Sequence, residues 1–587
     1  MSPALGRVAN WLAIPRREGL PADLLAGVVV AIMLVPQAMA YSLLAGLPPA
    51  IGLYAAMAAA LIYPLLGSSR YLAVGPVAIV SLLAATGITA LAPTGPQEYL
   101  AYAIQLALLV GALQLALGLA RLGFLVNFLS HAVVAGFTTA AALVIGLSQV
   151  KLLIGVTVPR TETFAELLAA LTRSLPQANP ATVALGLGSI ATLLFFSHGL
   201  GPILERTVVK SGWIVPLTKS APLVVVGLGT ALVAWFGLDT SAGVRVVGPI
   251  PAGLPWIRFS MPGLATWSAL LPTALAITFV GFAESYAVAK SLASKRREKV
   301  RANRELIALG AANVAASIVG GYPVTGGFSR SVVNFTAGAR SGAASIISGV
   351  LLILTLGFLT PLFRALPHAA LAAIIVVAVA KLVDFRSLRR LWRYSRADGT
   401  AYLVTFAAVL LVNVETGILV GAAVAVALHL WRTSRPHYAL VGRVGDSEHY
   451  RNVLRHEVQT DPGILALRID ESLYFANTAF LEDRILALVA DRPAVRHMVL
   501  IMSAVNFIDG TALETLEHLI EKLRDGGVML HLAEVKGPVM DRLRTSGLPD
   551  RLGPGRVFPT THAAMQGLAL TLPGSTPSGS YPTARVV

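Results

Sequence analysis

Apolar segments follow one another along most of this chain, and they constrain its fold more than any other feature. Hydrophobic residues make up 55% of the 587 positions and charged residues only 13%, whereas a soluble domain averages roughly 25% charged residues. The segments are uniformly apolar rather than alternating, which predicts membrane-spanning helices rather than strands. Fourteen such segments can be marked: 23–45, 50–66, 76–92, 98–119, 126–149, 181–199, 219–238, 268–292, 304–320, 328–338, 342–362, 368–383, 398–412 and 416–431.

The basic residues lie in short loops between these segments, and the net charge is +16. Residues 295–304 hold six Lys and Arg, and residues 385–396 hold five Arg. With fourteen spans and both termini inside, both loops face the cytoplasm, as the positive-inside rule requires. Such loops can also meet anionic lipid headgroups, and they lack the clustered basic face of a nucleic-acid-binding protein. Fourteen spans divide into seven plus seven, and a repeat with an odd number of spans must be inverted in the membrane.

Two segments are interrupted by glycine and proline. Residues 69–79 read SRYLAVGPVAI and residues 320–334 read GGYPVTGGFSRSVVN, so neither can be helical throughout. Hydrocarbon tolerates irregular backbone only where it lines a protein-enclosed cavity. The two segments fall at spans three and ten, which are equivalent positions in the two halves, and paired broken segments indicate the binding site of a secondary transporter.

The second broken segment contains groups that attract an anion. After the Gly326–Gly327 pair a helix is expected to begin near Phe328, with its free N–H groups and positive dipole end pointing toward the bilayer centre. Ser329 adds a hydroxyl donor and Arg330 a permanent positive charge. Gly75–Pro76 does the same from the opposite side, since proline is favoured in the first helical turn. A purely structural Arg330, paired with a carboxylate or with carbonyls, is the alternative.

Three polar residues lie in other spans. Glu284 follows about ten apolar residues, and a carboxylate is unfavourable there unless it is paired. It could carry a coupled proton, ligate a cation or balance Arg330, or it could belong to a purely structural ion pair. Gln37 and Tyr41 are four residues apart and share one face of span one, where we expect them to line the cavity; helix packing alone is the other interpretation.

The character of the chain changes after Trp431. Residues 463–475 and 497–502 are expected strands, 479–490 and 511–527 expected helices, and 528–535 another strand, which together predict a small α/β domain. The last residues are rich in Pro, Ser and Gly and are expected to be disordered. The expected division is a transmembrane domain over 1–435, an α/β domain over 436–568 and a tail over 569–587.

Other kinds of chemistry find no support in the sequence. The chain has no cysteine and eleven histidines, and the histidines lack the HExxH spacing of a metal site. It shows no hydrolase triad, no P-loop and no dinucleotide fingerprint, so we expect no enzymatic activity, no cofactor and no metal. Arg16 and Arg17 separate a short, Pro-broken apolar patch from the first span, which argues against a cleavable signal peptide.

Several long motifs are familiar. The sequence resembles the signature of the sulfate permease family, SulP, whose animal members include prestin and pendrin, over PQAMAYSLLAGLPPAIGLYAAMAAALIYPLLGSSRYLAVGPVA (36–78). It also resembles that family over FAESYAVAKSLA (282–293), ANRELIALGAANVAASIVGGYPVTGGFSRSVVN (302–334) and LPHAALAAIIVVAVAKLVD (366–384). The C-terminal domain resembles a STAS domain over LYFANTAFLEDRI (473–485) and VNFIDGTALETLEHL (505–519).

The resemblance implies an inverted seven-plus-seven transmembrane fold followed by a cytoplasmic STAS domain. Spans one to four and eight to eleven would form a core that moves against a gate, in the manner of an elevator. In the family the anion sits between the N-termini of helices three and ten, beside helix one. Carried over to this chain, the site is Gln37, Tyr41, Val77, Gly327, Phe328, Ser329 and Arg330.

The chain departs from the family pattern at two places. The position of Val77 is aromatic in the animal members, so this wall of the cavity differs. Glu284 lies where sodium-coupled bicarbonate members carry an aspartate ligand, but the hydroxyl residue that they have one turn later is Val288 here. The resemblance therefore favours proton coupling through Glu284 over a sodium site.

The resulting expectation is a secondary active transporter of a small anion, with sulfate first and bicarbonate or C4-dicarboxylates next. It would be a homodimer in the lipid bilayer of the cell membrane, the bacterial inner membrane, with both termini and the STAS domain cytoplasmic. The alternatives are a sodium-coupled transporter, an uncoupled anion transporter or channel, and a STAS-based regulatory scaffold held at the membrane.

Overall fold

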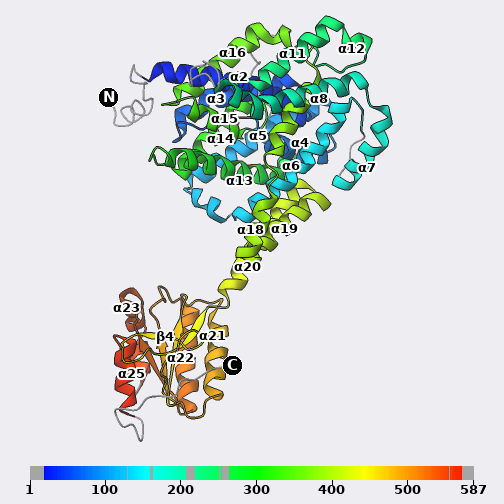
Figure 1. The fold of residues 1–587 in the computed structure, drawn as a ribbon. Coiled ribbons are helices and arrows are strands. Elements are labelled where there is room, and N and C mark those ends of the chain that lie inside the picture. Colours follow the sequence, from blue (N-terminus) through cyan, green and yellow to red (C-terminus); the bar gives the residue numbers. More distant parts are fainter. Residues whose placement is uncertain are drawn as a thin grey trace, which may run out of the picture. The chain divides into compact units, whose positions relative to one another are not determined.

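The computed structural model describes residues 19–128, 130–158, 163–205, 217–218, 220–249, 253, 264–553 and 556–571. It divides into two compact units, residues 1–425 and 426–587 (Figure 1). The division falls within a helix rather than after residue 435. Most of the tail expected over 569–587 lies outside the described residues.

The first unit is helical. Its first half contains α2 (Leu20–Leu44), α3 (Pro49–Leu66), α4 (Ala78–Ala90), α5 (Pro96–Leu119), α6 (His131–Ile154), α7 (Phe164–Ser174), α8 (Pro180–Leu194), α9 (Leu200–Glu205), α11 (Ala221–Phe236) and α12 (Leu238–Ser241). Its second half contains α13 (Leu264–Ser294), α14 (Ala302–Ile318), α15 (Phe328–Thr336), α16 (Ala343–Leu354), α17 (His368–Ala380), α18 (Phe385–Tyr394), α19 (Arg396–Leu411) and the start of α20 (Val414–Thr433).

Each of the fourteen predicted segments coincides with a helix, the sixth with α8 and α9 joined by a π-helical turn over Phe195–Gly199. Nine helices of the described residues are long and apolar enough to cross a membrane, and α4 and α11 are shorter apolar helices. Three helices in the described part of this unit were not expected. The basic loop expected over 385–396 contains α18, α7 is an amphipathic helix between spans, and α12 is a single turn after α11.

Small residues let α5 and α14 approach closely. A Cβ built on Gly111 would lie 2.9 Å from the carbonyl oxygen of Gly310, and the reverse contact has the same length. Beside this crossing, the Asn313 side chain donates to Gln114 Oε1 at 3.0 Å. Its Nδ2 also donates to the Val324 carbonyl at 3.0 Å, and its Oδ1 accepts from the Val324 N–H at 2.8 Å. Close packing of small residues and a buried amide are typical of helix contacts in membranes, and here they fix the second broken segment.

Two fully buried carboxylates join the halves of this unit. Glu305 of α14 accepts hydrogen bonds from Tyr63 Oη and from the backbone and side chain of Ser68, each at 2.6 Å. Asp23 of α2 accepts from the Arg340 backbone at 2.7 Å and from the Ser341 hydroxyl at 2.6 Å. Since a buried carboxylate is tolerated only when its oxygens are satisfied, these contacts anchor both loops.

The second unit is an α/β domain, as predicted. It contains β3 (Tyr438–Arg443), β4 (Tyr450–Asn452), β5 (Ile464–Ile469), α21 (Thr478–Ala490), β6 (His497–Ile501), α22 (Gly510–Asp525), β7 (Met529–Ala533), α23 (Gly537–Thr545), α24 (Leu548–Arg551), β8 (Val557–Phe558) and α25 (Thr561–Ala569). The sheet order is β4-β3-β5-β6-β7-β8, parallel from β5 to β8 and antiparallel at β3 and β4.

Every residue of β6 is buried, because helices cover both faces of the sheet. Alternate residues of this strand point to opposite faces. Met498 and Leu500 belong to the apolar core with α21 and α22, whereas Val499 and Ile501 pack with Leu568 of α25. Burial on both sides explains the continuous apolar run HMVLI.

Candidate functional site

The two broken segments lie side by side. Val74–Gly75 forms a short strand, β1, that pairs antiparallel with β2, Thr325–Gly326. The pairing continues where Gly327 donates its N–H to the carbonyl of Ala73 at 3.0 Å. β1 leads into α4 and β2 leads into α15. Because antiparallel strands run in opposite directions, these helices leave the pair in opposite directions and their N-termini face each other.

Both helix N-termini are uncapped by side chains. Helix α15 begins at Phe328, as predicted, with Gly327 as its N-cap. Helix α4 begins at Ala78 with Val77 as its N-cap, so the expectation that Pro76 sits in the first helical turn is wrong. Paired to β2, residues 74–75 are extended, and the helix can begin only after the chain has left this pairing. The first-turn N–H groups of each helix have no intrahelical acceptor and carry the positive dipole end.

The side chain of Arg330 lies between these two helix starts. It is only 2% exposed, and its Nη1 donates to the Oε1 of Gln37 in α2 at 3.2 Å. A Cβ built on Gly327 would lie 2.7 Å from Nη2, and one built on Gly75 would lie 3.5 Å from it. Glycine at 327 therefore leaves the space into which the guanidinium folds back against its own helix start.

Among the described residues, no carboxylate is in direct contact with Arg330. No ion pair joins it to a carboxylate in the described part of the chain, and its Nε and Nη2 are buried without a hydrogen-bond partner there. Gln37 is neutral, so its contact with Arg330 does not compensate the positive charge. A buried, unpaired cation beside two positive dipole ends is unfavourable by itself. An anion bound there would accept from the free guanidinium and from the helix N–H groups.

Glu284 of α13 is half-buried, and its Oε2 is buried without a hydrogen-bond partner among the described residues. The same part of the structure contains no direct ion pair between Glu284 and Arg330, so the balancing of this arginine by Glu284 stays a prediction. One turn along the helix, Val288 is buried and apolar. Glu284 is therefore a carboxylate without a fixed cationic partner.

The neighbouring residue of α13 holds β2 in place, a role that the sequence did not indicate. Ser285 Oγ accepts from the Gly326 N–H at 2.8 Å and donates to Thr325 Oγ1 at 2.7 Å. The Thr325 hydroxyl in turn donates to the carbonyl of Gly281 at 2.7 Å. Glu284 thus lies beside the residue that binds the second broken segment. The one signal that could have suggested this role is a hydroxyl residue next to Glu284 within an apolar span.

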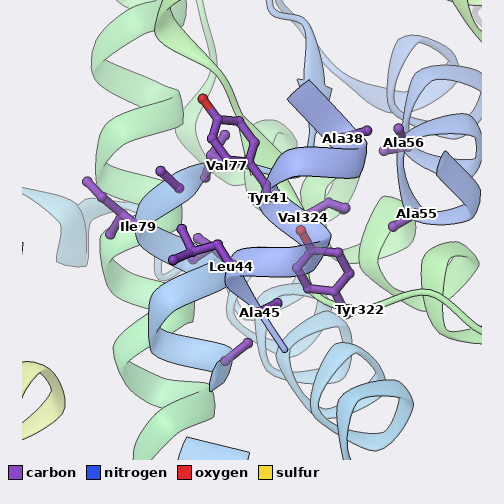
Figure 2. Close-up of a cluster of buried hydrophobic side chains, with 14 of the residues drawn as sticks. Ala38, Tyr41, Leu44, Ala45, Ala55, Ala56, Val77, Ile79, Tyr322 and Val324 are labelled. Carbon is purple, nitrogen blue, oxygen red and sulfur yellow. The ribbon is translucent and has the colours of Figure 1, made fainter. Parts of the chain in front are cut away.

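An apolar cluster forms the other wall of the site. Figure 2 shows Tyr41 of α2 and Val77 at the start of α4 in one cluster with Tyr322, which precedes β2. Tyr322 is fully buried, and its hydroxyl is 2.8 Å from the Ser81 hydroxyl of α4. This contact joins the two broken segments a second time, and Tyr322 was not among the predicted site residues.

Phe328 and Ser329 differ from Arg330 in exposure. Phe328 is 57% exposed and Ser329 is also exposed. Since successive helical residues point about 100° apart, the first turn of α15 presents Phe328 and Ser329 to an open space and Arg330 to the interior. Of the predicted residues, the structure brings Gln37, Gly327 and Arg330 into direct contact and places Tyr41 and Val77 in the adjoining apolar cluster.

Comparison with known proteins gives two matching families. Residues 20–405 match the sulfate permease family, and residues 455–564 match the STAS domain. The chain is 36% identical over 556 residues to the probable sulfate transporter 4.2 of Arabidopsis thaliana, covering 93% of this chain and 80% of that protein. It is 37% identical over 572 residues to the chloroplastic sulfate transporter 4.1 of the same plant, covering 95% and 81%.

Solved structures agree with this fold. Murine Solute Carrier 26 family member A9, an anion transporter solved in the inward-facing state, superposes with a TM-score of 0.87 at 26% identity, covering 97% of this chain and 95% of that one. The transmembrane domain of the cyanobacterium bicarbonate transporter BicA superposes with a TM-score of 0.58 at 22% identity, covering 70% and 98%. At that identity the second likeness concerns the fold alone.

Proposed function

The chain belongs to the sulfate permease family, and from this premise we propose that it is a secondary active transporter whose first substrate is sulfate. Bicarbonate and C4-dicarboxylates are the next candidates. The plant relatives are named sulfate transporters, and the two solved structures are named an anion and a bicarbonate transporter.

One observation supports this proposal most strongly: the buried Arg330 guanidinium has two nitrogens without a partner among the described residues, between two uncapped helix N-termini. Each of these groups is a donor or a positive end, and no carboxylate of the described residues pairs with the arginine. A doubly charged tetrahedral oxyanion has enough acceptor oxygens to satisfy several donors together. Charge-assisted hydrogen bonds to such an oxyanion are stronger than those between neutral groups.

For the coupling ion we propose a proton carried by Glu284. A carboxyl group with a buried, unpartnered oxygen can take up and release a proton without breaking a fixed ion pair. The apolar Val288 one turn later removes one oxygen ligand that a sodium ion would need. Sodium coupling and uncoupled conduction are the alternatives, and they predict different gradient responses.

The transport movement that we propose is an elevator-type displacement of the site-bearing helices. The strands β1 and β2 are bonded to each other and, through Ser285 and Asn313, to α13 and α14. These elements would therefore move as one body. We further propose a homodimer in the cell membrane. The basic loops support a cytoplasmic position of the STAS domain and of both termini.

The test is sulfate uptake by the purified protein in proteoliposomes. We expect saturable uptake that an inward proton gradient accelerates and a sodium gradient does not, with unlabelled bicarbonate and malate as competitors. Empty liposomes are the control. Saturable uptake without macroscopic current excludes a channel, and absence of uptake for every anion tried would favour the regulatory scaffold.

A further inference from the structure

A basic cavity of ≈ 760 Å³ lies at the end of α5, apart from the site residues described above. It is bordered by the α5 terminus, the following turn, Tyr286 of α13 and the first turns of α14. Arg121, Arg301 and Arg304 line it, and none of the residues that line it is acidic.

The three arginines differ in their contacts. Arg304 donates from Nε to the backbone carbonyl of Leu66 at 3.1 Å. Neither Arg121 nor Arg301 has a side-chain hydrogen bond or ion pair within the described ranges. Like charges that share a recess repel one another unless an anion lies between them.

The neighbouring carboxylates are engaged elsewhere. Glu305 is fully buried and accepts the hydrogen bonds from Tyr63 and Ser68 described above. Glu298 pairs with Arg70 at 3.4 Å and accepts from Tyr71 Oη at 3.2 Å. Neither carboxylate lines the cavity, and within the described ranges neither forms an ion pair with Arg121 or Arg301.

The backbone at Arg121 is unusual. Its φ is +59°, in the left-handed region where glycine is the residue without strain. The turn ends α5, with Leu122 N–H donating to the Leu117 carbonyl at 2.9 Å, a position where glycine is commonest. Arginine at this position places a guanidinium at the cavity despite the strain of the backbone.

We propose that this cavity binds the phosphate headgroup of an anionic phospholipid. Guanidinium groups match phosphate oxygens in geometry and charge. Beside them, Leu119 is 71% and Phe124 is 53% exposed, and both line the same cavity. The site is at the end of a membrane-spanning helix, where headgroups and the start of the acyl chains are found. A lipid satisfies both features, since its phosphate meets the arginines and its chain covers the two apolar side chains.

The experiment measures lipid binding to the full-length protein in detergent by native mass spectrometry, independently of transport. The probes are short-chain phosphatidylglycerol, short-chain phosphatidylcholine and inorganic phosphate. We expect the wild type to retain phosphatidylglycerol in preference to both others. In Arg121→Gly and Arg301→Gln the affinity should fall about fivefold each, the effect of one basic residue near an anionic headgroup.

Two controls distinguish lipid binding at this cavity from a loss of stability and from a general loss of positive charge. Arg121→Gly removes the guanidinium and relieves the left-handed strain, so its melting temperature should be equal to or above that of the wild type. The matched control is Arg297→Gln with Lys299→Gln, two exposed cations of the same loop that do not line the cavity. Equal loss in the control and the cavity variants would overturn the proposal. If inorganic phosphate bound as tightly as phosphatidylglycerol, the assignment to a lipid would be overturned.

Discussion

Arg330 of α15 donates from Nη1 to the Oε1 of Gln37 in α2 at 3.2 Å. The acceptor is a neutral amide, so the contact orients the guanidinium without cancelling its charge. The remaining buried nitrogens, Nε and Nη2, have no partner among the described residues. This arrangement makes Arg330 available to a bound anion, and the first two predictions test it.

Replacing Arg330 by alanine should abolish sulfate binding while the protein remains folded in detergent. Two charge-assisted hydrogen bonds contribute roughly 1.5–3 kcal/mol each, so a loss of at least about a hundredfold in affinity is expected. Arg330→Lys is the comparison variant, since it keeps the charge but not the planar fork. Isothermal titration with sulfate measures the affinity, and an unchanged affinity of Arg330→Ala would refute the site.

Replacing Gln37 by glutamate should weaken sulfate binding by about tenfold or more, because an internal carboxylate then competes for the guanidinium. The same variant should melt at a higher temperature in the absence of anion, since a paired buried charge is more stable than an unpaired one. Sulfate affinity and melting temperature are measured on one preparation. If both equal the wild-type values, the Gln37–Arg330 contact is not part of the site.

Glu284→Gln should make uptake insensitive to an imposed pH gradient. The amide keeps the shape of the side chain but cannot carry a proton. Uptake into proteoliposomes is compared with and without the gradient, and sulfate affinity serves as the control for a preserved site. Loss of expression or thermal stability would instead indicate a structural role. A wild type that follows a sodium gradient and ignores pH would reject proton coupling.

The stability of the STAS domain should fall as the pH is lowered from about 6.5 toward 4. Its His531 and His497 are buried in one chain of hydrogen bonds: the Arg556 N–H lies 3.1 Å from His531 Nδ1, and His531 Nε2 lies 3.1 Å from His497 Nδ1. Burial, together with the nearby His497 and Arg556, lowers the pKa of His531 to about 4. As the pH falls, the unfolded chain binds a proton at His531 before the folded domain does. The contribution of neutral His531 to the free energy of unfolding is therefore complete above the pKa of an unfolded histidine and is lost as the pH falls toward the folded pKa.

This dependence can be measured by thermal unfolding of a fragment covering residues 436–571 between pH 4 and 8. His531→Gln, whose amide can donate and accept but does not titrate, should show a flatter profile over that range. His562→Gln, at a histidine of the same domain outside this chain of hydrogen bonds, provides the control. Identical pH profiles of wild type and His531→Gln would contradict the role of the buried pair.

Truncation after Arg435 should leave a helical unit that still binds sulfate, because every proposed site residue lies upstream. Its affinity should remain within about tenfold of the full-length value, or ~1.4 kcal/mol, although the transport rate can fall. Sulfate titration of the truncated protein provides the measurement. Complete loss of binding by a folded truncation would mean that the C-terminal domain shapes the site.

Much of this architecture was predictable because composition and local pattern determine it. Uniformly apolar runs gave the positions of the helices, and the Gly326–Gly327 pair marked the start of α15 at Phe328. The local sequence pattern did not reveal elements that are highly charged or very short. The density of arginines made α18 resemble a loop, and β8, with two residues, is too short to show an alternation.

The site itself needed the tertiary structure. Val74 and Gly326 are far apart in sequence, and only their pairing turns two interrupted segments into two opposed helix starts. The burial of Arg330, its bond to Gln37 and the contact of Ser285 with Gly326 depend equally on packing between distant helices. The sequence by itself determined which residues could bind an anion, because side-chain chemistry and backbone breakage are local properties. Only the tertiary structure decided which of them meet, because the distance between two helices is set by the packing of the whole core.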